Sequence, residues 1–579
     1  MKTLDYDLVV FGSGIAGFKA AIHASERNKD LRICIISKLH AMRSHSVSAE
    51  GGISGVLYPD ISKDSEELHA YDTIKGSDYL ADQDAVRLLV ERAPDEIKYL
   101  DHIGVPWNRT KNGGVEERPF GGMSIPRTAF AADKTGFFIM RALYDRVLEN
   151  RNIEIFHEHF VTSIFTEKKK FAGLTAINIA TGETVAFTGR ACVVATGGFS
   201  RIFKFTTTSH STTGDGTTLL FNAGFALKDM EFVQFHPTAL VPSGILITEA
   251  ARGEGGYLLN SKGERFMGRY AKAKMELAPR DIISRSIMTE IENGRGFSDK
   301  EYGFEYINLD LRHIDSEKLS EKLPMIAEIT KRMLKLDPGK DLIPVRPGAH
   351  FTMGGVHTDI YGRALDSEGN PAKGIWAIGE CASVSVHGAN RLGSNSLSQC
   401  AVWGRIAGEE AAEYIAKQSK EKTDRKFIEH AETEEKRLAH MISLSGENNP
   451  YEIKAELEQT MDDCFFVYRK ESEMITGIKK IAELKERFSD IYVEDRGRVY
   501  NTNLTNVLEI RNLLELAGVT AEAALNRKES RGAHSRIEYP ERNDSEWLKH
   551  TIISKEGKRT KITYLPVKML SWKPEPRIY

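Results

Sequence analysis

The stretch YDLVVFGSGIAG, residues 6–17, decides the fold of this 579-residue chain. YDLVVF is typical of a short buried strand, and it is followed by a glycine-rich turn, a helix-like run to about Asn28 and a second strand, RICIIS. This order predicts a βαβ unit. Gly12, Gly14 and Gly17 form the pattern G-x-G-x-x-G, in which glycine permits a tight turn and the helix N-terminus offers N–H groups to a pyrophosphate. The stretch therefore predicts a dinucleotide site.

The second strand distinguishes between the two common dinucleotides. An NAD site usually has an acidic residue at its end for the ribose, whereas this strand ends in Ser37 and Lys38. Two more buried strands end in glycine turns far downstream, ACVVATGG and GIWAIGE, the second of which ends at Glu380. FAD is long, and its adenine, pyrophosphate and flavin ends need turns from several strands. The three turns together favour FAD over NAD.

A sheet assembled from such distant pieces implies that other segments are inserted between them. We expect an α/β fold: a Rossmann-like FAD-binding domain with an inserted α+β capping domain, then a helical domain and a small C-terminal domain. The expected boundaries are 1–235 and 351–417 for FAD binding, 236–350 for the cap, 418–528 for the helices and 529–579 for the C-terminal domain. Helix-period segments such as NVLEIRNLLELAGVTAEAAL suggest that the helical domain is scaffold.

Composition excludes several classes of protein. Lys and Arg number 79 against 82 Asp and Glu, a net charge of -3, so nothing attracts the chain to nucleic acid. The five cysteines form no C-x-x-C pair, which argues against a disulfide scaffold, a metal site or an iron-sulfur cluster in this chain. No apolar run approaches the ~18 residues of a membrane span, and no signal peptide is evident. We expect a cytoplasmic chain that is not anchored by its own sequence.

Eleven further stretches carry a resemblance that runs from end to end of the chain. They are RSHSVSAEGG, TGDG, QFHPT, ITEAARGEGG, GERFM, PRDIISRS, HFTMGG, GECAS, ANRLGSNSL, YNTNL and ESRGAHSR. With these motifs the chain resembles the flavoprotein subunit of succinate dehydrogenase and fumarate reductase, the catalytic part of complex II.

The resemblance implies that His45 is bonded covalently to the flavin 8α carbon. Alkylation there raises the reduction potential, and oxidation of an unactivated CH2–CH2 bond needs a strong acceptor. Glu50 departs from the glutamine of many relatives. A helix starting near Ser396 is expected to direct its positive end toward the flavin N1 and O2 edge. The implied FAD contacts are Gly12, Ser13, Gly14, Ala16, Gly17, Ser37, Lys38, Ser44, His45, Gly51, Gly52, Thr196, Gly197, Asp215, Glu380, Ser396 and Leu397.

The resemblance also implies a dicarboxylate site for succinate and fumarate. His236 and Thr248 hold one carboxylate, His350 and Arg391 hold the other, and Phe120 lines the pocket. A guanidinium suits this task because it grips carboxylate with two nitrogens and keeps its charge.

The proton that moves during the reaction is assigned separately. Side-chain pKa values alone favour a histidine or a glutamate as its carrier. The family instead implies Arg280, relayed through Glu249 and Arg252.

The implied partners are an iron-sulfur subunit and, beyond it, membrane anchor subunits and quinone, which would place the chain at the cytoplasmic face of the cell membrane. Succinate oxidation is the expected direction, with fumarate reduction as the alternative because both use the same residues. L-Aspartate oxidase is a further alternative, but it normally lacks the flavin-bonding histidine, so His45 discriminates. A flavin-binding scaffold without activity would have no need of so many charged residues in one pocket.

Overall fold

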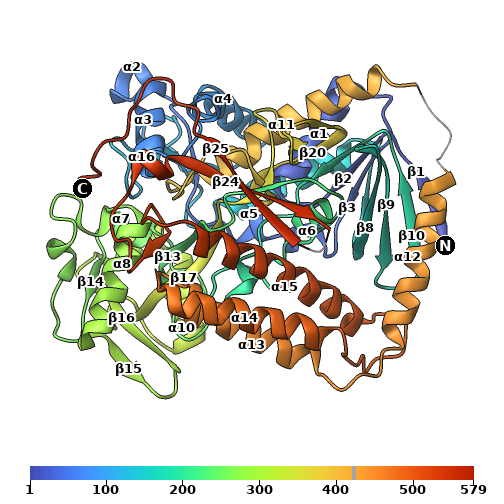
Figure 1. Cartoon of the computed structure of the whole chain (residues 1–579). Helices are drawn as coiled ribbons and strands as arrows, with labels where there is room; N and C mark the ends of the chain where they lie inside the picture. Colours follow the sequence, from blue (N-terminus) through green and yellow to red (C-terminus); the bar gives the residue numbers. More distant parts are fainter. Residues whose placement is uncertain (420–424, 558) are drawn as a thin grey trace.

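The computed structural model describes residues 1–419, 425–557 and 559–579, so residues 420–424 of the expected helical domain and residue 558 of the expected C-terminal domain lie outside the described residues (Figure 1). A ten-stranded sheet forms the centre of the FAD-binding part. Its order is β1 (Lys2–Asp5), β10 (Thr184–Thr188), β9 (Lys170–Asn178), β20 (Pro371–Ala377), β11 (Ala191–Val194), β2 (Leu8–Phe11), β3 (Ile33–Ile36) and β7 (Ile153–Phe156), with β8 (His159–Glu167) on β9 and β19 (Arg363–Leu365) on β20.

The three strands that end in glycine turns are direct neighbours in this sheet. β11 pairs in parallel with β2 on one side and with β20 on the other, and Val193 lies opposite both Val10 and Trp376. Because the carboxyl ends of parallel strands meet at one edge, the three turns gather there. The expected α/β fold class is confirmed.

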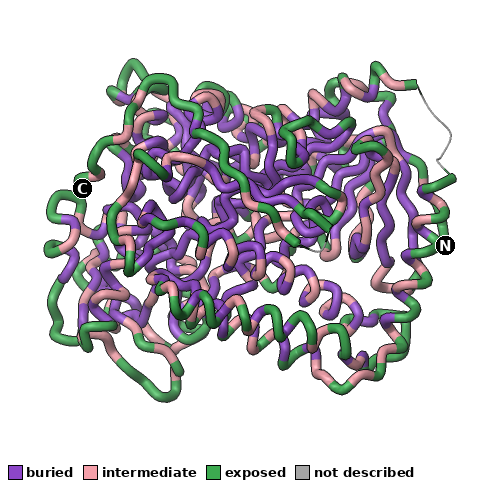
Figure 2. The backbone as a smooth tube through the Cα atoms, viewed as in Figure 1, coloured by how far each residue is buried: buried purple, intermediate pink, exposed green. Residues whose placement is uncertain are grey.

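α1 (Ile15–Arg27) and α11 (Asn395–Ala416) pack on one face of the sheet, α5 (Thr135–Glu149) packs on α1, and α4 (Gln83–His102) packs on α11. All four share a buried apolar core with the sheet. α1 and α11 approach closely because α11 carries glycine where they meet. A Cβ at Gly408 would lie 2.3 Å from the carbonyl oxygen of Ala20. Figure 2 shows that α1 and the central strands beneath it are mostly buried, whereas the outer helices have exposed turns.

The inserted segment folds around its own antiparallel sheet and apolar core, coloured green in Figure 1. The sheet order is β13 (Val233–Leu240), β17 (Ile343–Thr352), β16 (Phe304–Asp310) and β14 (Tyr257–Leu259), with β15 (Phe297–Asp299) on β16. The helices are α7 (Ala250–Gly253), α8 (Arg280–Glu290), α9 (Ser316–Lys322) and α10 (Pro324–Leu334). Since β13 begins the insertion and β17 ends it, their pairing brings both junctions with the FAD-binding part together.

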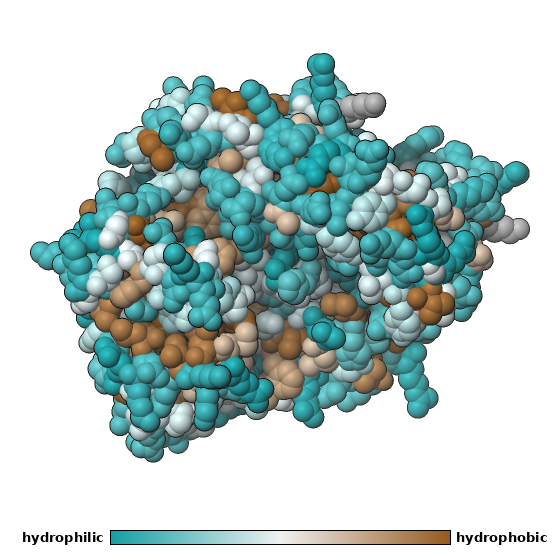
Figure 3. Space-filling model, turned by 90° about the horizontal axis from the view of Figure 1, so that it is seen from below, coloured by the Kyte–Doolittle hydropathy of each residue, from teal (hydrophilic) through white to brown (hydrophobic). Residues whose placement is uncertain are grey.

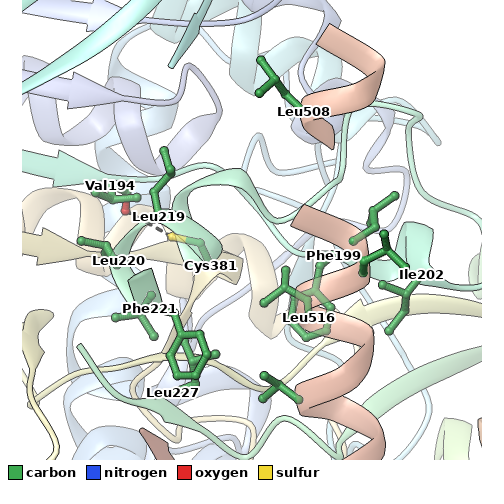
Figure 4. Close-up of a cluster of buried hydrophobic side chains, with 14 of the residues drawn as sticks. Val194, Phe199, Ile202, Leu219, Leu220, Phe221, Leu227, Cys381, Leu508 and Leu516 are labelled. Carbon is green, nitrogen blue, oxygen red and sulfur yellow. Dashed lines mark hydrogen bonds between the residues drawn. The ribbon is translucent and has the colours of Figure 1, made fainter. Parts of the chain in front are cut away.

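The later helices divide into two groups. α12 (Arg425–Ile442) lies against β8, β9 and β10, whereas α13 (Pro450–Phe465), α14 (Glu471–Phe488) and α15 (Thr502–Asn526) pack on one another. α15 also packs on α6 (Asp215–Asn222), and Figure 4 shows Leu516 of α15 beside Phe199 and Ile202 of the FAD-binding part. Apolar burial therefore fixes α15 directly on the FAD-binding part.

The C-terminal segment completes a second sheet instead of forming one alone. β24 (Lys549–Glu556) and β25 (Arg559–Pro566) form a hairpin in the order β21 (Ala382–Ser383), β18 (Gly355–His357), β12 (Leu227–Lys228), β24, β25. The weakly periodic sequence had not indicated these strands. The domain boundaries themselves stay predictions.

The surface is mostly polar. In the view from below, hydrophilic residues dominate and hydrophobic ones gather in a few patches (Figure 3). Among the described residues, no helix is both long and apolar enough to cross a membrane.

A buried ion cluster joins the hairpin of β24 and β25 to the rest of the protein, and we expect it to make the stability of the fold depend on pH. His550 of β24 lies 2.7 Å from Asp229 and 3.2 Å from Asp82. Although burial alone would lower it, the two carboxylates raise the pKa of His550 to about 9. This folded pKa exceeds the unfolded value near 6.5, so the stabilisation is complete below about pH 6.5 and is lost as pH rises through 9.

We expect the melting temperature of the wild-type protein to fall between pH 6.5 and 9.5, reflecting a loss on the order of 3 kcal/mol. The variant His550→Gln should melt lower at pH 6.5 and lose less over the same range. Thermal scans of both proteins at each pH test this. Equal pH slopes in the two proteins would contradict the assignment.

Candidate functional site

A cavity of about 1300 Å³ lies between the glycine turns, the inserted segment and α15. It is lined by every expected FAD contact except Gly17, and by Phe120, His236, Thr248, Glu249, Arg280, His350 and Arg391. Arg252 also lies outside the lining and contacts Glu249 from behind. Gly17 instead permits the turn to pack on the helix, because a Cβ there would lie 2.0 Å from the carbonyl oxygen of Gly12. The sequence thus identified most of one continuous site.

The G-x-G-x-x-G turn has the close packing that a dinucleotide needs. Gly12 has a φ of +117°, and a Cβ there would lie 2.2 Å from the carbonyl oxygen of Ala195. Gly14 is the N-cap residue of α1, so the first turn of that helix begins at the cavity wall, where the N–H of Ile15 donates to the Ser46 hydroxyl at 3.3 Å. The hydroxyl groups of Ser13 and Ser37 lie 2.6 Å apart in the same wall. These groups fit the pyrophosphate and ribose of FAD.

Lys38 occupies the place where an NAD site carries its acid, and acidic residues surround it. Its Nζ donates to Asp215 at 2.7 Å, to Glu509 at 2.6 Å and to Thr213 at 2.7 Å. Burial alone would lower the pKa of Lys38, but the two carboxylates raise it. Glu509 comes from α15, which the sequence suggested was only scaffold. No local signal links Glu509 to Lys38, because the two are separated by 471 residues.

His45 is held as a neutral imidazole. The backbone N–H of Ser209 donates to its Nδ1 at 3.3 Å, and Arg201 donates to the carbonyl oxygen of Ser209 at 3.2 Å. Burial, together with the charge of Arg201, lowers the pKa of His45 to about 4. Since an N–H can only be accepted by an unprotonated nitrogen, Nδ1 carries no proton in this arrangement. The imidazole is uncharged at neutral pH, and its single proton lies on Nε2.

The two predicted substrate histidines come from paired strands. His236 of β13 and His350 of β17 have ring centroids 5.0 Å apart. The Nδ1 of His350 lies 2.7 Å from the Thr207 hydroxyl, and the Nδ1 of His236 accepts from the N–H of Thr238 at 3.2 Å. Among the described residues, nothing bonds to the buried Nε2 of His236. Burial and nearby arginines hold both pKa values well below the usual range, so both rings are neutral.

Two arginines complete this end of the cavity. Arg391 donates to the Ser396 hydroxyl at 3.1 Å, while its Nε has no hydrogen-bond partner among the described residues. Arg280 donates from Nε to Glu249 at 2.7 Å and from Nη1 to Gln234 at 3.0 Å. Burial and the charge of Arg280 hold the pKa of Arg391 well below its usual value. Two buried arginines thus lie near each other, with Glu249 bonded to Arg280 and Glu380 the stronger carboxylate influence on Arg391, an arrangement that a bound dianion would help to balance.

Arg280 and Arg252 lie on either side of Glu249: Arg280 is hydrogen-bonded to its carboxylate, and Arg252 approaches it at ion-pair distance. Arg252 lies 3.7 Å from the Glu249 carboxylate and donates to the carbonyl oxygen of Glu276 at 2.5 Å. Although burial would raise it, the two arginines hold the pKa of Glu249 below its usual value. Glu249 is therefore ionised at neutral pH. Gln234, which orients Arg280, was not singled out from the sequence although it lies in the motif QFHPT.

Two acids, Glu50 and Glu380, also line the cavity. Burial raises the pKa of Glu380 to about 7, and its carboxylate accepts from the N–H of Thr352 at 3.0 Å. Burial and Asp133 raise the pKa of Glu50 well above its usual value. Protonated acids at these two places can donate hydrogen bonds to a polar ring edge.

Comparison with known proteins gives matches across the chain. The FAD binding domain family model matches residues 7–397, and the fumarate reductase flavoprotein C-terminal model matches residues 454–579. The chain is 42% identical over 593 residues to the fumarate reductase flavoprotein subunit of Mycobacterium tuberculosis, with 100% of both chains covered. It is 40% identical over 584 residues to the succinate dehydrogenase flavoprotein subunit of Rickettsia bellii, covering 98% of this chain and 96% of that one. A solved mutant of the Escherichia coli quinol fumarate reductase flavoprotein matches with a TM-score of 0.95 and 40% identity, over 100% of this chain and 99% of that one.

Proposed function

We propose that this chain, which belongs to the family of fumarate reductase and succinate dehydrogenase flavoprotein subunits, is the catalytic subunit that oxidises succinate to fumarate in a complex II-type enzyme. The observation that carries the proposal is the buried cavity end where Arg280, Arg391 and two neutral histidines converge. Such a site suits a small dicarboxylate, because each carboxylate can pair with a cation or a hydrogen-bond donor in a cavity from which water is excluded.

Each substrate carboxylate has its own set of residues in this proposal. His236 and Thr248 bind one, with the unpartnered Nε2 of His236 directed to it. His350 and Arg391 bind the other, and Phe120 closes the wall. Bound FAD supplies the two-electron acceptor, and the residues of this chain fix the substrate and exclude water from it.

Arg280 is the proton carrier that we propose. In succinate oxidation it accepts the proton that leaves the substrate carbon, and in fumarate reduction it donates one. Glu249 and Arg252 pass that proton onward. The ionised Glu249 at 2.7 Å supports this role, because a carboxylate in direct contact can exchange a proton with the guanidinium. An arginine can also stabilise negative charge on the reacting carbon while it transfers the proton.

We propose that FAD is bonded covalently to His45. Its support is the lowered pKa, which leaves a neutral imidazole at the cavity wall, and the Ser209 contact, which fixes the ring. L-Aspartate oxidase is disfavoured because it normally lacks this histidine.

Electrons must leave the cofactor for a partner. We propose an iron-sulfur subunit, followed by membrane anchor subunits and quinone, with this chain peripheral at the cytoplasmic face of the membrane. The names of the relatives support this, since they are subunits and one belongs to a quinol fumarate reductase. Fumarate reduction is the alternative direction, and the potentials of partner and quinone decide between the two.

The test is turnover by the full-length flavinylated protein with succinate and an artificial acceptor dye. Dye reduction that depends on succinate supports the proposal. L-Aspartate replaces succinate in a parallel assay, and turnover of aspartate alone would favour the oxidase. Absence of turnover with either substrate would favour a flavin-binding scaffold.

Arg391→Lys should raise KM for succinate about 10- to 100-fold, because a point charge replaces a guanidinium that binds carboxylate at two nitrogens. Flavin content should not change. Steady-state kinetics and flavin absorbance measure the two quantities. A KM within twofold of wild type would remove Arg391 from the substrate site.

A further inference from the structure

The last residues of the chain reach the start of α8, the helix that carries Arg280. After β25 the chain runs without helix or strand over the FAD-binding part and ends between α3 (Glu66–Gly76) and the green inserted segment (Figure 1). Its path is fixed at the start by Gln83, whose side-chain oxygen accepts from the N–H groups of Leu570, Ser571 and Trp572 at 2.7, 2.8 and 3.2 Å. The C-terminal tail, residues 567–579, is therefore held against the FAD-binding part by hydrogen bonds.

Arg577 is the residue by which the tail joins the two parts of the molecule. Its guanidinium binds both oxygens of Asp281, at 2.8 and 3.0 Å, and one oxygen of Asp78 at 3.2 Å. Asp281 belongs to the first turn of α8, in the inserted segment, whereas Asp78 follows α3 in the FAD-binding part. The side chains are buried, with exposed fractions of 7% for Arg577, 0% for Asp281 and 9% for Asp78. One guanidinium thus links the inserted segment to the FAD-binding part.

Asp281 directly follows Arg280, the first residue of α8. We propose that Arg577 is a positioning residue that fixes the start of α8, and hence Arg280, relative to the FAD-binding part. The inference rests on the proposed role of Arg280. The Arg280 side chain itself is oriented by Glu249 and Gln234, while Asp281 fixes the backbone from which that side chain extends.

A buried carboxylate must be paired, so Asp281 has few alternatives. Its second partner is Arg285 at 3.0 Å, a side chain that is 29% exposed and that also donates to the carbonyl oxygen of Gly532 at 2.5 Å. Without Arg577, the Arg285 contact is the hydrogen bond that would still join α8 to the C-terminal segment among the described residues, while Tyr468 holds the later part of the helix through Thr289 and the Arg285 carbonyl. Displacement of a reacting group by about 1 Å can reduce turnover about 100-fold.

The experiment replaces Arg577 by alanine in the full-length flavinylated protein. We expect kcat for succinate to fall about 10- to 100-fold while KM changes less than about threefold, because Arg577 contacts no residue that we assign to carboxylate binding. Proton transfer should become slower relative to the other steps. The solvent deuterium isotope effect on kcat should therefore increase, which a general loss of stability would not cause.

Arg542→Gln is the matched control. Arg542 donates to the same Asp78 at 2.8 Å, to Asp544, and to the carbonyl oxygen of Glu575 in the tail at 3.0 Å, whereas no contact with Asp281 is present among the described residues. The variant therefore removes a tail contact and an Asp78 contact but keeps the pair between Arg577 and Asp281. It should leave kcat and the isotope effect within twofold of wild type. An Arg577→Ala protein with wild-type kcat, or with a loss no larger than that of Arg542→Gln, would overturn the inference, as would a rise in KM that accounts for the whole loss.

Arg577→Lys covers the case in which the alanine variant does not fold. Lysine keeps the charge but not the two-nitrogen grip on Asp281, so kcat should be intermediate and the isotope effect still raised. Wild-type values for both would overturn the inference. A wild-type protein that does not oxidise succinate would contradict the proposed function as well, whereas normal wild-type turnover with unchanged Arg577 variants would contradict the positioning role alone.

Discussion

Arg280→Lys is expected to reduce succinate oxidation by about 10³- to 10⁴-fold while leaving FAD in place. Arg280 uses two nitrogens at once, Nε for Glu249 and Nη1 for Gln234, and still has to face the substrate. Lysine has one nitrogen instead of a planar fork of three, so it cannot bond to Glu249 and Gln234 and also transfer a proton to or from the substrate. Turnover with dye and flavin absorbance of the same preparation measure the two effects.

Arg312→Lys provides the comparison, because Arg312 belongs to the same inserted segment but pairs with Asp310 at a partly exposed edge. It should behave as wild type. If Arg280→Lys keeps near-wild-type turnover, Arg280 is not the proton carrier, and the relay through Glu249 and Arg252 loses its basis. Loss of flavin in the same variant would point to misfolding instead and would call for Arg280→Gln under identical conditions.

The parts of the site that the sequence predicted are those with a local physical signature. A buried strand followed by glycine identifies a turn at a sheet edge, so Gly12, Thr196 and Glu380 were placed without knowledge of the insertions between them. The substrate residues needed the resemblance, because the pairing of β13 with β17 that joins His236 and His350 spans more than a hundred residues of insertion.

The parts that were missed depend on tertiary contacts alone. Glu509 has an ordinary helix-period environment, and only the packing of α15 on α6 brings it to Lys38. β25 was missed because most of its residues are exposed and polar, so no alternation of apolar residues indicates a strand. Arg577 sits in a polar, proline-containing tail, where nothing in the sequence predicts a buried ion pair with Asp281.

His45→Ser should remove the covalent flavin and, with it, most succinate oxidation. After denaturing gel electrophoresis we expect flavin fluorescence on the wild-type polypeptide and none on the variant. The variant should still bind FAD, because the glycine turns, the helix start and the Lys38 cluster do not depend on His45. Native flavin absorbance before denaturation measures that binding.

The loss of activity should depend on direction, because alkylation of the flavin raises its reduction potential. For a two-electron couple each 30 mV of lowered potential costs about tenfold in the equilibrium constant for succinate oxidation. A loss of about 60 mV therefore reduces that equilibrium constant about 100-fold, while fumarate reduction with a strong artificial donor continues.

His40→Ser is the matched control: His40 lies in the same loop, stacks on His157 at 4.4 Å and is not among the residues that line the cavity. It should keep both the fluorescent band and succinate oxidation. A fluorescent His45→Ser polypeptide would show that the flavin is attached at another residue. A non-fluorescent His45→Ser polypeptide that oxidises succinate normally would show that the reaction does not need the covalent bond.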